Sequence, residues 1–199
     1  MRTHLPVVTF IFLGATLSTS LRAQRAVTET RTPAVEVALS DQAVQLKYHS
    51  ASDIGGEGSR LFYSMFLSEE RDVVGSAGLL LDSDLSVGSF DVRFGPQAYA
   101  GLLKDENQDV FALALGLEAR LDLIRDRALA IVASAYYSPD VLTFGSADNL
   151  TDFMVRGEAR INDRLVAVAG YRWLELDLLM RQDRSLQNEV FAGVRWQIR

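Results

Sequence analysis

The feature that most constrains this chain is a two-residue alternation of side-chain type, which recurs through most of the sequence after residue 33. In residues 110–121, VFALALGLEARL, Phe111 and four leucines share one parity, and small or charged residues prevail on the other. A period of two belongs to an extended strand, whose successive side chains point to opposite faces. The sequence therefore predicts an all-β fold, and the open question is which face lies inside.

Ten such segments follow one another, separated by polar breaks typical of hairpin turns. They cover residues 34–40, 43–49, 59–67, 73–81, 89–102, 109–121, 128–138, 150–161, 164–176 and 187–199. Residues 139–149 and 177–186 are expected to be long outer loops. Merging 34–49 into one bulged strand would give nine strands, and eight is a further alternative. Because an open sheet of ten strands leaves two unpaired edges, we expect a closed antiparallel up-and-down β-barrel.

The second parity decides which face lies inside. It places arginines and carboxylates among small residues, whereas a water-facing parity would be rich in lysine, and the chain has only Lys47 and Lys104. Guanidinium groups can make two hydrogen bonds to one carboxylate, which suits a confined interior. We therefore expect a transmembrane barrel whose apolar parity faces lipid. The charged side chains expected in its lumen are Arg60, Asp91, Arg93, Glu118, Arg120, Asp152, Arg156, Glu158, Arg160, Arg172 and Arg195.

Aromatic residues on the apolar parity support this assignment, since membrane barrels carry aromatic girdles at both interfaces. Several lie near strand ends, and they are Tyr48, Tyr63, Phe90, Phe111, Tyr137, Phe153, Tyr171, Trp173 and Trp196. A tilted strand needs roughly 9–11 residues to cross a bilayer. The segments from residue 89 onward meet this length, and the first four, at 7–9 residues, are shorter.

Residues 1–23 have the organisation of a secretory signal peptide. A basic start at Arg2 precedes an apolar stretch over residues 5–17, and the expected cleavage follows Ala23. The alternative is a retained anchor, but about 13 apolar residues are too few for a membrane-spanning helix. Residues 24–199 then form one barrel domain with 18 Lys and Arg against 26 Asp and Glu, a net charge of −8 that disfavours nucleic-acid binding. The chain has no cysteine, which excludes disulfides and thiol chemistry.

Residues suited to catalysis or metal binding are few. His49, beside Ser50 and Ser52, could serve as a general base in an envelope lipid-modifying enzyme, but a polar residue at a strand end is the favoured interpretation. Carboxylate pairs such as Asp82 and Asp84 lack the spacing of a calcium loop and are expected to be turn charges. We therefore expect no enzymatic activity and no catalytic residue, cofactor site or metal site.

Three motifs resemble the YfaZ family of predicted outer-membrane proteins. They are Leu39-Ser40-Asp41 with Val44 and Tyr48, Tyr136-Tyr137-Ser138-Pro139-Asp140-Val141-Leu142 with Phe144, and Gly170-Tyr171-Arg172. The resemblance spans most of the chain after the signal and implies a small outer-membrane barrel in a Gram-negative envelope. It implies no particular activity or functional residues. Tyr136 and Tyr137 are expected to anchor a strand at the interface, with a recognition surface as the alternative.

The sequence thus indicates an exported, monomeric outer-membrane barrel with a structural or interaction role and a polar, salt-bridged lumen. The expected partners are outer-membrane lipid and, during biogenesis, the barrel assembly machinery. A small porin is the first alternative, in which the arginines would line a narrow passage for anions. A barrel of eight to ten strands has little free interior space, which favours a filled lumen. A lipid-modifying enzyme and a soluble periplasmic barrel of the lipocalin type are further alternatives.

Overall fold

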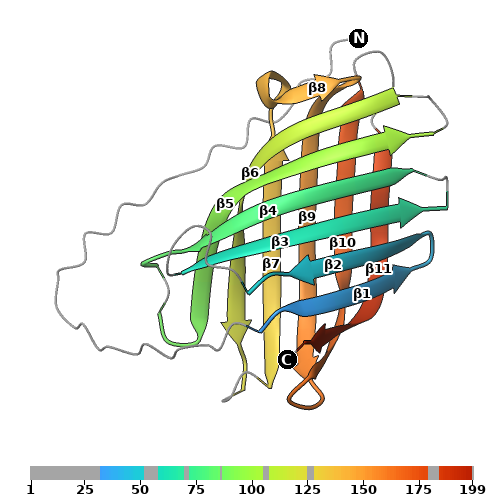
Figure 1. Ribbon diagram of the computed structural model, residues 1–199. Coiled ribbons are helices and arrows are strands. Elements are labelled where there is room, and N and C mark those ends of the chain that lie inside the picture. Colours follow the sequence, from blue (N-terminus) through green and yellow to red (C-terminus); the bar gives the residue numbers. More distant parts are fainter. Residues whose placement is uncertain are drawn as a thin grey trace, which may run out of the picture. The chain divides into compact units, whose positions relative to one another are not determined.

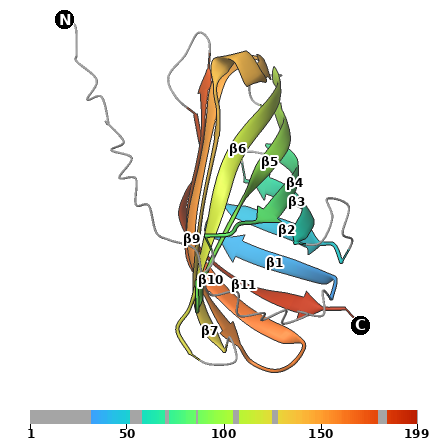
Figure 2. The ribbon, with the colours of Figure 1, turned by 90° about the vertical axis from the view of Figure 1, so that its left-hand side faces the viewer.

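The described part of the chain is a β-barrel. The computed structural model describes residues 32–51, 58–69, 72–85, 87–104, 108–124, 128–178 and 184–198, so the signal peptide expected at residues 1–23 lies outside it. Ten strands form the wall: β1 (Ala34–Ser40), β2 (Ala43–His49), β3 (Ser59–Ser68), β4 (Val73–Asp82), β5 (Phe90–Leu103), β6 (Gln108–Asp122), β7 (Leu129–Ser138), β9 (Ala147–Arg160), β10 (Leu165–Leu178) and β11 (Arg184–Gln197). Figures 1 and 2 show β1 to β6 on one side of the barrel and β7, β9, β10 and β11 on the other.

Each strand of the wall pairs antiparallel with the next, and the last strand pairs with the first. β1 lies against β11 along its whole length, from Ala34 opposite Gln197 to Ser40 opposite Phe191. β5 also pairs with β6, which completes the hydrogen-bonded circuit. The expected closed up-and-down barrel of ten strands is therefore confirmed. No helix in the described ranges is both long and apolar enough to cross a membrane.

The expectation of long loops at residues 139–149 and 177–186 is wrong in part. β9 begins at Ala147 and β10 runs on to Leu178, so both strands enter the expected loops. The connection before β9 also contains a 3₁₀ turn, η2 (Asp140–Leu142), and a short strand, β8 (Thr143–Gly145), which pairs with β6. Strand pairing continues into the expected loops through Asp177 opposite Asn149 and Leu178 opposite Ala147, and Ala147 is buried in the barrel.

The apolar parity points away from the barrel axis, as expected. On β6, Leu115 is 64% exposed and Leu117 is 48% exposed, whereas Ala112 and Ala114 on the other parity are fully buried. Tyr48 and Tyr63 stack on the outer surface with ring centroids 6.5 Å apart. An apolar surface of this extent fits a lipid environment rather than water.

The interior has two layers, one rich in ion pairs and one mainly apolar. We call the end of the barrel where β1 begins and β11 ends the terminal end, and the opposite end the loop end. The charged side chains gather at the terminal end, while the loop end is filled by apolar side chains, including Phe66, Val74, Leu103, Val110, Leu150, Leu174, Leu176 and Leu186. This half departs from the expectation of a salt-bridged lumen because it is mainly apolar, although Asp72, Ser138, Thr143 and Gln187 are also buried there. A narrow barrel has to be filled by its own side chains, and apolar ones fill a space without needing polar partners.

Gly116 on β6 allows the wall to pack closely against β7. A Cβ atom at this position would lie 2.3 Å from Cδ1 of Tyr136 and 2.4 Å from the carbonyl oxygen of Ala135. We expect Gly116→Ala to lower the free energy of unfolding by about 1–3 kcal/mol, because the backbone oxygen cannot move without distorting the sheet. Urea unfolding of the barrel in lipid vesicles measures the change.

The matched control is Gly75→Ala on β4, where the nearest atom to a new Cβ is the carbonyl oxygen of Ala100 at 3.9 Å. This substitution should change the free energy of unfolding by less than about 0.5 kcal/mol. Equal unfolding midpoints for the two variants would contradict the close approach at Gly116.

Candidate functional site

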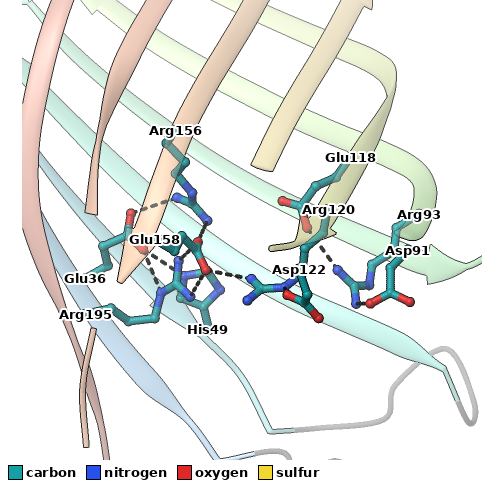
Figure 3. A network of polar contacts seen from close by, with 10 residues as sticks. All are labelled: Glu36, His49, Asp91, Arg93, Glu118, Arg120, Asp122, Arg156, Glu158 and Arg195. Carbon is teal, nitrogen blue, oxygen red and sulfur yellow. Dashed lines mark hydrogen bonds and ion pairs between the residues drawn. The ribbon is translucent and has the colours of Figure 1, made fainter. Parts of the chain in front are cut away.

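Glu36 and Glu158 are the centre of an ion-pair network inside the terminal end (Figure 3). Glu36 accepts hydrogen bonds from Nη1 of Arg156 at 2.9 Å and from Nε of Arg195 at 2.8 Å. Glu158 lies 2.9 Å from Nη2 of Arg156, accepts a bond of 2.6 Å from Nη1 of Arg120, and also contacts Arg195. Two arginines therefore bridge the two central carboxylates.

The network joins strands that are far apart in the sequence. Glu36 lies on β1, Arg156 and Glu158 lie two residues apart on β9, and Arg195 lies on β11 opposite Glu36. The side chains of Glu36 and Glu158 are each only 3% exposed, and that of Arg156 is 4% exposed. Charges at this depth are tolerated only when they are paired and hydrogen-bonded. The barrel must therefore close at the β1–β11 pairing for Glu36 to reach its partners.

Arg93 on β5 organises a second branch of the network. Its Nε donates to Oδ1 of Asp82 at 2.8 Å, its Nη1 donates to Oε1 of Glu118 at 3.2 Å, and its Nη2 lies 3.8 Å from Asp91. Arg93 is 4% exposed, whereas Asp82 is 46% exposed, so this branch reaches from the interior to the mouth of the terminal end. Figure 3 shows Arg93 with Asp91 and Glu118 beside the pair formed by Arg120 and Asp122.

A third group lies at the boundary between the two interior layers. Arg172 donates from Nε and Nη2 to the two oxygens of Asp152 at 3.0 and 2.8 Å, and the hydroxyl of Tyr99 donates to Asp152 at 2.8 Å. Cζ of Arg172 lies 5.8 Å from the ring centroid of Phe66, which belongs to the apolar layer. This two-pronged ion pair therefore connects the charged layer to the apolar layer.

The contacts of these three groups include nine of the side chains expected in the lumen: Asp91, Arg93, Glu118, Arg120, Asp152, Arg156, Glu158, Arg172 and Arg195. Arg60 is half-buried near the start of β3. Arg160 is exposed at the last position of β9, beyond Glu158.

Sequence reasoning missed several members of the site. Glu36 was not considered, although it alternates with the outward residues Val35 and Val37 and the same rule assigns it to the interior. Asp82, interpreted as a turn charge, ends β4 and pairs with Arg93. His49 ends β2, as expected, but its Nε2 lies 3.6 Å from Glu36. Ser52, its suggested neighbour, lies outside the described residues.

The expectation that Tyr136 and Tyr137 both anchor the strand at the interface is wrong for one of them. Tyr137 is 53% exposed on the outer surface, whereas Tyr136 is 6% exposed and belongs to the buried cluster. Neighbouring residues of a strand point to opposite faces, so the two rings cannot share one environment.

Over the described ranges, no cluster of three or more His, Asp or Glu residues is placed to hold a metal ion. The carboxylates of the site are instead directed at guanidinium groups, an arrangement that neutralises buried charge and locks strands together.

We expect Glu36→Gln to lower the free energy of unfolding by about 3 kcal/mol or more, because the buried guanidinium groups of Arg156 and Arg195 lose a shared carboxylate. Asp82→Asn removes a carboxylate that is 46% exposed and should cost less than about 1 kcal/mol. Urea unfolding in detergent micelles, followed by tryptophan fluorescence, compares the two variants. A smaller loss for Glu36→Gln than for Asp82→Asn would show that Glu36 is not central to the network.

The chain resembles one protein family and several solved outer-membrane structures. A family model described as YfaZ precursor matches residues 63–198. No curated protein matches the sequence. Among solved structures, the chain is similar to a bacterial polysaccharide outer membrane secretin, with a TM-score of 0.50, 16% identity, and coverage of 79% of this chain and 56% of that chain. This likeness supports the barrel fold, and the chain spans little more than half of that protein.

Two further structures resemble the chain more weakly. The outer membrane channel DcaP of Acinetobacter baumannii matches with a TM-score of 0.41 and 8% identity, covering 82% of this chain and 54% of that chain. A KdgM porin in complex with disordered oligogalacturonate matches with a TM-score of 0.45 and 9% identity, covering 84% of this chain and 99% of that chain.

Proposed function

This chain belongs to the YfaZ family, and from that membership and the barrel fold we propose that it is an outer-membrane protein with a structural or interaction role and a filled interior. The proposal depends on one observation, the burial of the interior side chains at both ends of the barrel. At the terminal end, Arg156 and Glu158 are 4% and 3% exposed. At the loop end, Leu150 and Leu174 are 1% and 0% exposed. A water-filled passage would leave its lining accessible to solvent.

The outer surface supports a location in lipid. Large apolar side chains are exposed on every strand of the wall except β4, whose outward Val73, Leu79 and Leu81 are half-buried. Phe153 and Trp173 lie opposite each other on β9 and β10, and Trp196 lies near the terminal end, as in the aromatic girdles of membrane barrels. A barrel with an even number of strands has both chain termini at the same end, and bacterial barrels keep these termini in the periplasm, so we assign the terminal end to that side.

The remaining parts of the proposal follow from this location. The signal at residues 1–23 would export the chain, the barrel assembly machinery would insert it, and it would act as a monomer surrounded by lipid. The anion-selective porin is the weaker candidate, because the guanidinium groups of Arg93, Arg156 and Arg195 are paired with carboxylates and present no free row of positive charge.

Planar lipid bilayers test the filled interior. Purified protein whose gel mobility changes on heating, as expected of a folded barrel, should give no steady current steps above those of the bare membrane, because no continuous water path crosses the interior. The porin alternative requires steady steps whose ion selectivity changes with Arg120→Glu. Such steps, altered in that variant, would refute the filled barrel.

A further inference from the structure

The terminal end carries an exposed apolar rim that the proposed function does not use. We call Val87, Leu123, Ile124, Ile161 and Ile198 the terminal rim. Val87 is 74% exposed, Ile161 is 61% exposed and Ile124 is 53% exposed, and all five residues lie beyond the ends of the strands of the wall. Connections on the water side of a barrel are ordinarily polar, so aliphatic side chains at this level need a partner.

The terminal rim is one continuous structure. Backbone hydrogen bonds of 2.8 or 2.9 Å join its neighbouring connections: Asp122 N–H to the carbonyl of Ser89, Leu123 N–H to that of Leu129, Arg160 N–H to that of Ala128, and Gln197 N–H to that of Arg164. The connections before β5, before β7 and before β10 and the end of β11 therefore adjoin one another around the barrel. The aliphatic side chains of the terminal rim therefore lie on neighbouring connections rather than at isolated points of the barrel.

The terminal rim continues directly into the lipid-facing surface. Phe90 and Leu121 lie opposite each other at the ends of β5 and β6, next to the rim, and each is 41% exposed. Trp196 is 57% exposed on the last strand, two residues before Ile198. Because Leu123 and Ile198 each follow a lipid-facing residue of their strand, Leu121 and Trp196, by two positions, the lipid that covers the barrel wall can also cover the rim.

Charges near the rim indicate the kind of lipid. Exposed Arg160 and Arg164 flank Ile161 in the turn between β9 and β10, with the exposed carboxylate of Asp163 beside them. Asp82 and Asp84 are also exposed at the terminal end, before β5, so the basic character is local to the turn between β9 and β10. At the loop end Lys104 is the one exposed basic residue among the described residues, beside Asp41, Glu69, Asp109 and Asp140. A turn with two arginines around an aliphatic residue suits the headgroup layer of an anionic phospholipid leaflet.

We propose that the terminal rim sits in the headgroup layer of the adjoining leaflet and that Arg160 and Arg164 select anionic phospholipids there. The inference rests on the membrane location proposed above. It names a lipid partner for one end of the barrel, and it gives Arg160 a role outside the interior network.

Fluorescence quenching by brominated lipids tests the position of the rim. Trp173→Phe and Trp196→Phe remove the two native tryptophans, and one tryptophan is then introduced by Ile161→Trp at the rim, Leu117→Trp on the wall or Val141→Trp at the loop end. In phosphatidylcholine vesicles with bromine close to the headgroup, we expect Ile161→Trp to be quenched at least about twofold more than Val141→Trp. Leu117→Trp should be quenched most strongly by bromine placed deep in the acyl chains.

The selectivity is tested with brominated phosphatidylglycerol against brominated phosphatidylcholine at equal mole fraction. One basic residue at an anionic surface favours binding by roughly fivefold, so the relative binding constant at Ile161→Trp should favour phosphatidylglycerol at least about threefold. Arg160→Gln combined with Arg164→Gln should bring that ratio close to one. The matched control, Lys104→Gln at the loop end, should leave it unchanged.

The quenching results distinguish a failure of the rim proposal from a failure of the proposed membrane location. Quenching at Leu117→Trp without quenching at Ile161→Trp would overturn the rim and leave the membrane barrel intact. An equal response to the two lipids, or a preference that survives the double arginine substitution, would overturn the selectivity. An unquenched Leu117→Trp would overturn both proposals.

Discussion

The pairing of buried carboxylates with arginines at the closure of the barrel is the interaction on which the rest of the structure depends. Glu36 of the first strand meets Arg195 of the last strand and Arg156 of β9, and these groups can meet only when the wall is closed. An unpaired charge at this depth costs several kcal/mol. Closure therefore stabilises the ion pairs, and the ion pairs stabilise closure, while the outer surface of the wall is mainly apolar.

Two layers of side chains fill the interior of the barrel. Ion pairs occupy the terminal end, and the apolar cluster occupies the loop end, with Asp152 and Arg172 between them and Phe66 against the guanidinium. In the charged layer the carboxylates face arginines, and in the apolar layer the aliphatic chains face one another. The proposed filled interior follows from these two layers, and it would leave the two ends and the outer surface of the barrel as the places where a partner can bind.

Much of the fold was predictable from the sequence, because the two-residue period is local and survives in every strand of the wall. The interior was predictable only in part. Alternation assigns Glu36 and Tyr99 to the inside, but it does not say that Glu36 meets Arg156, since that contact depends on how β1 and β9 face each other across the closed barrel. The inward residues of the loop end, such as Phe66 and Leu174, are apolar like the core residues of a soluble barrel. Alternation alone therefore does not tell them apart from such a core. β8 is three residues long, too short for a periodic signal.

The most direct test of the account is a spin-label scan of residues 110–121 in lipid vesicles. The chain has no cysteine, so each introduced cysteine carries the only label. Collision with oxygen, which dissolves in lipid, should be high at residues 111, 113, 115, 117 and 121 and low at the even positions that point inward. The opposite phase, with the even positions open to oxygen, would place the leucines inside and contradict the central claim.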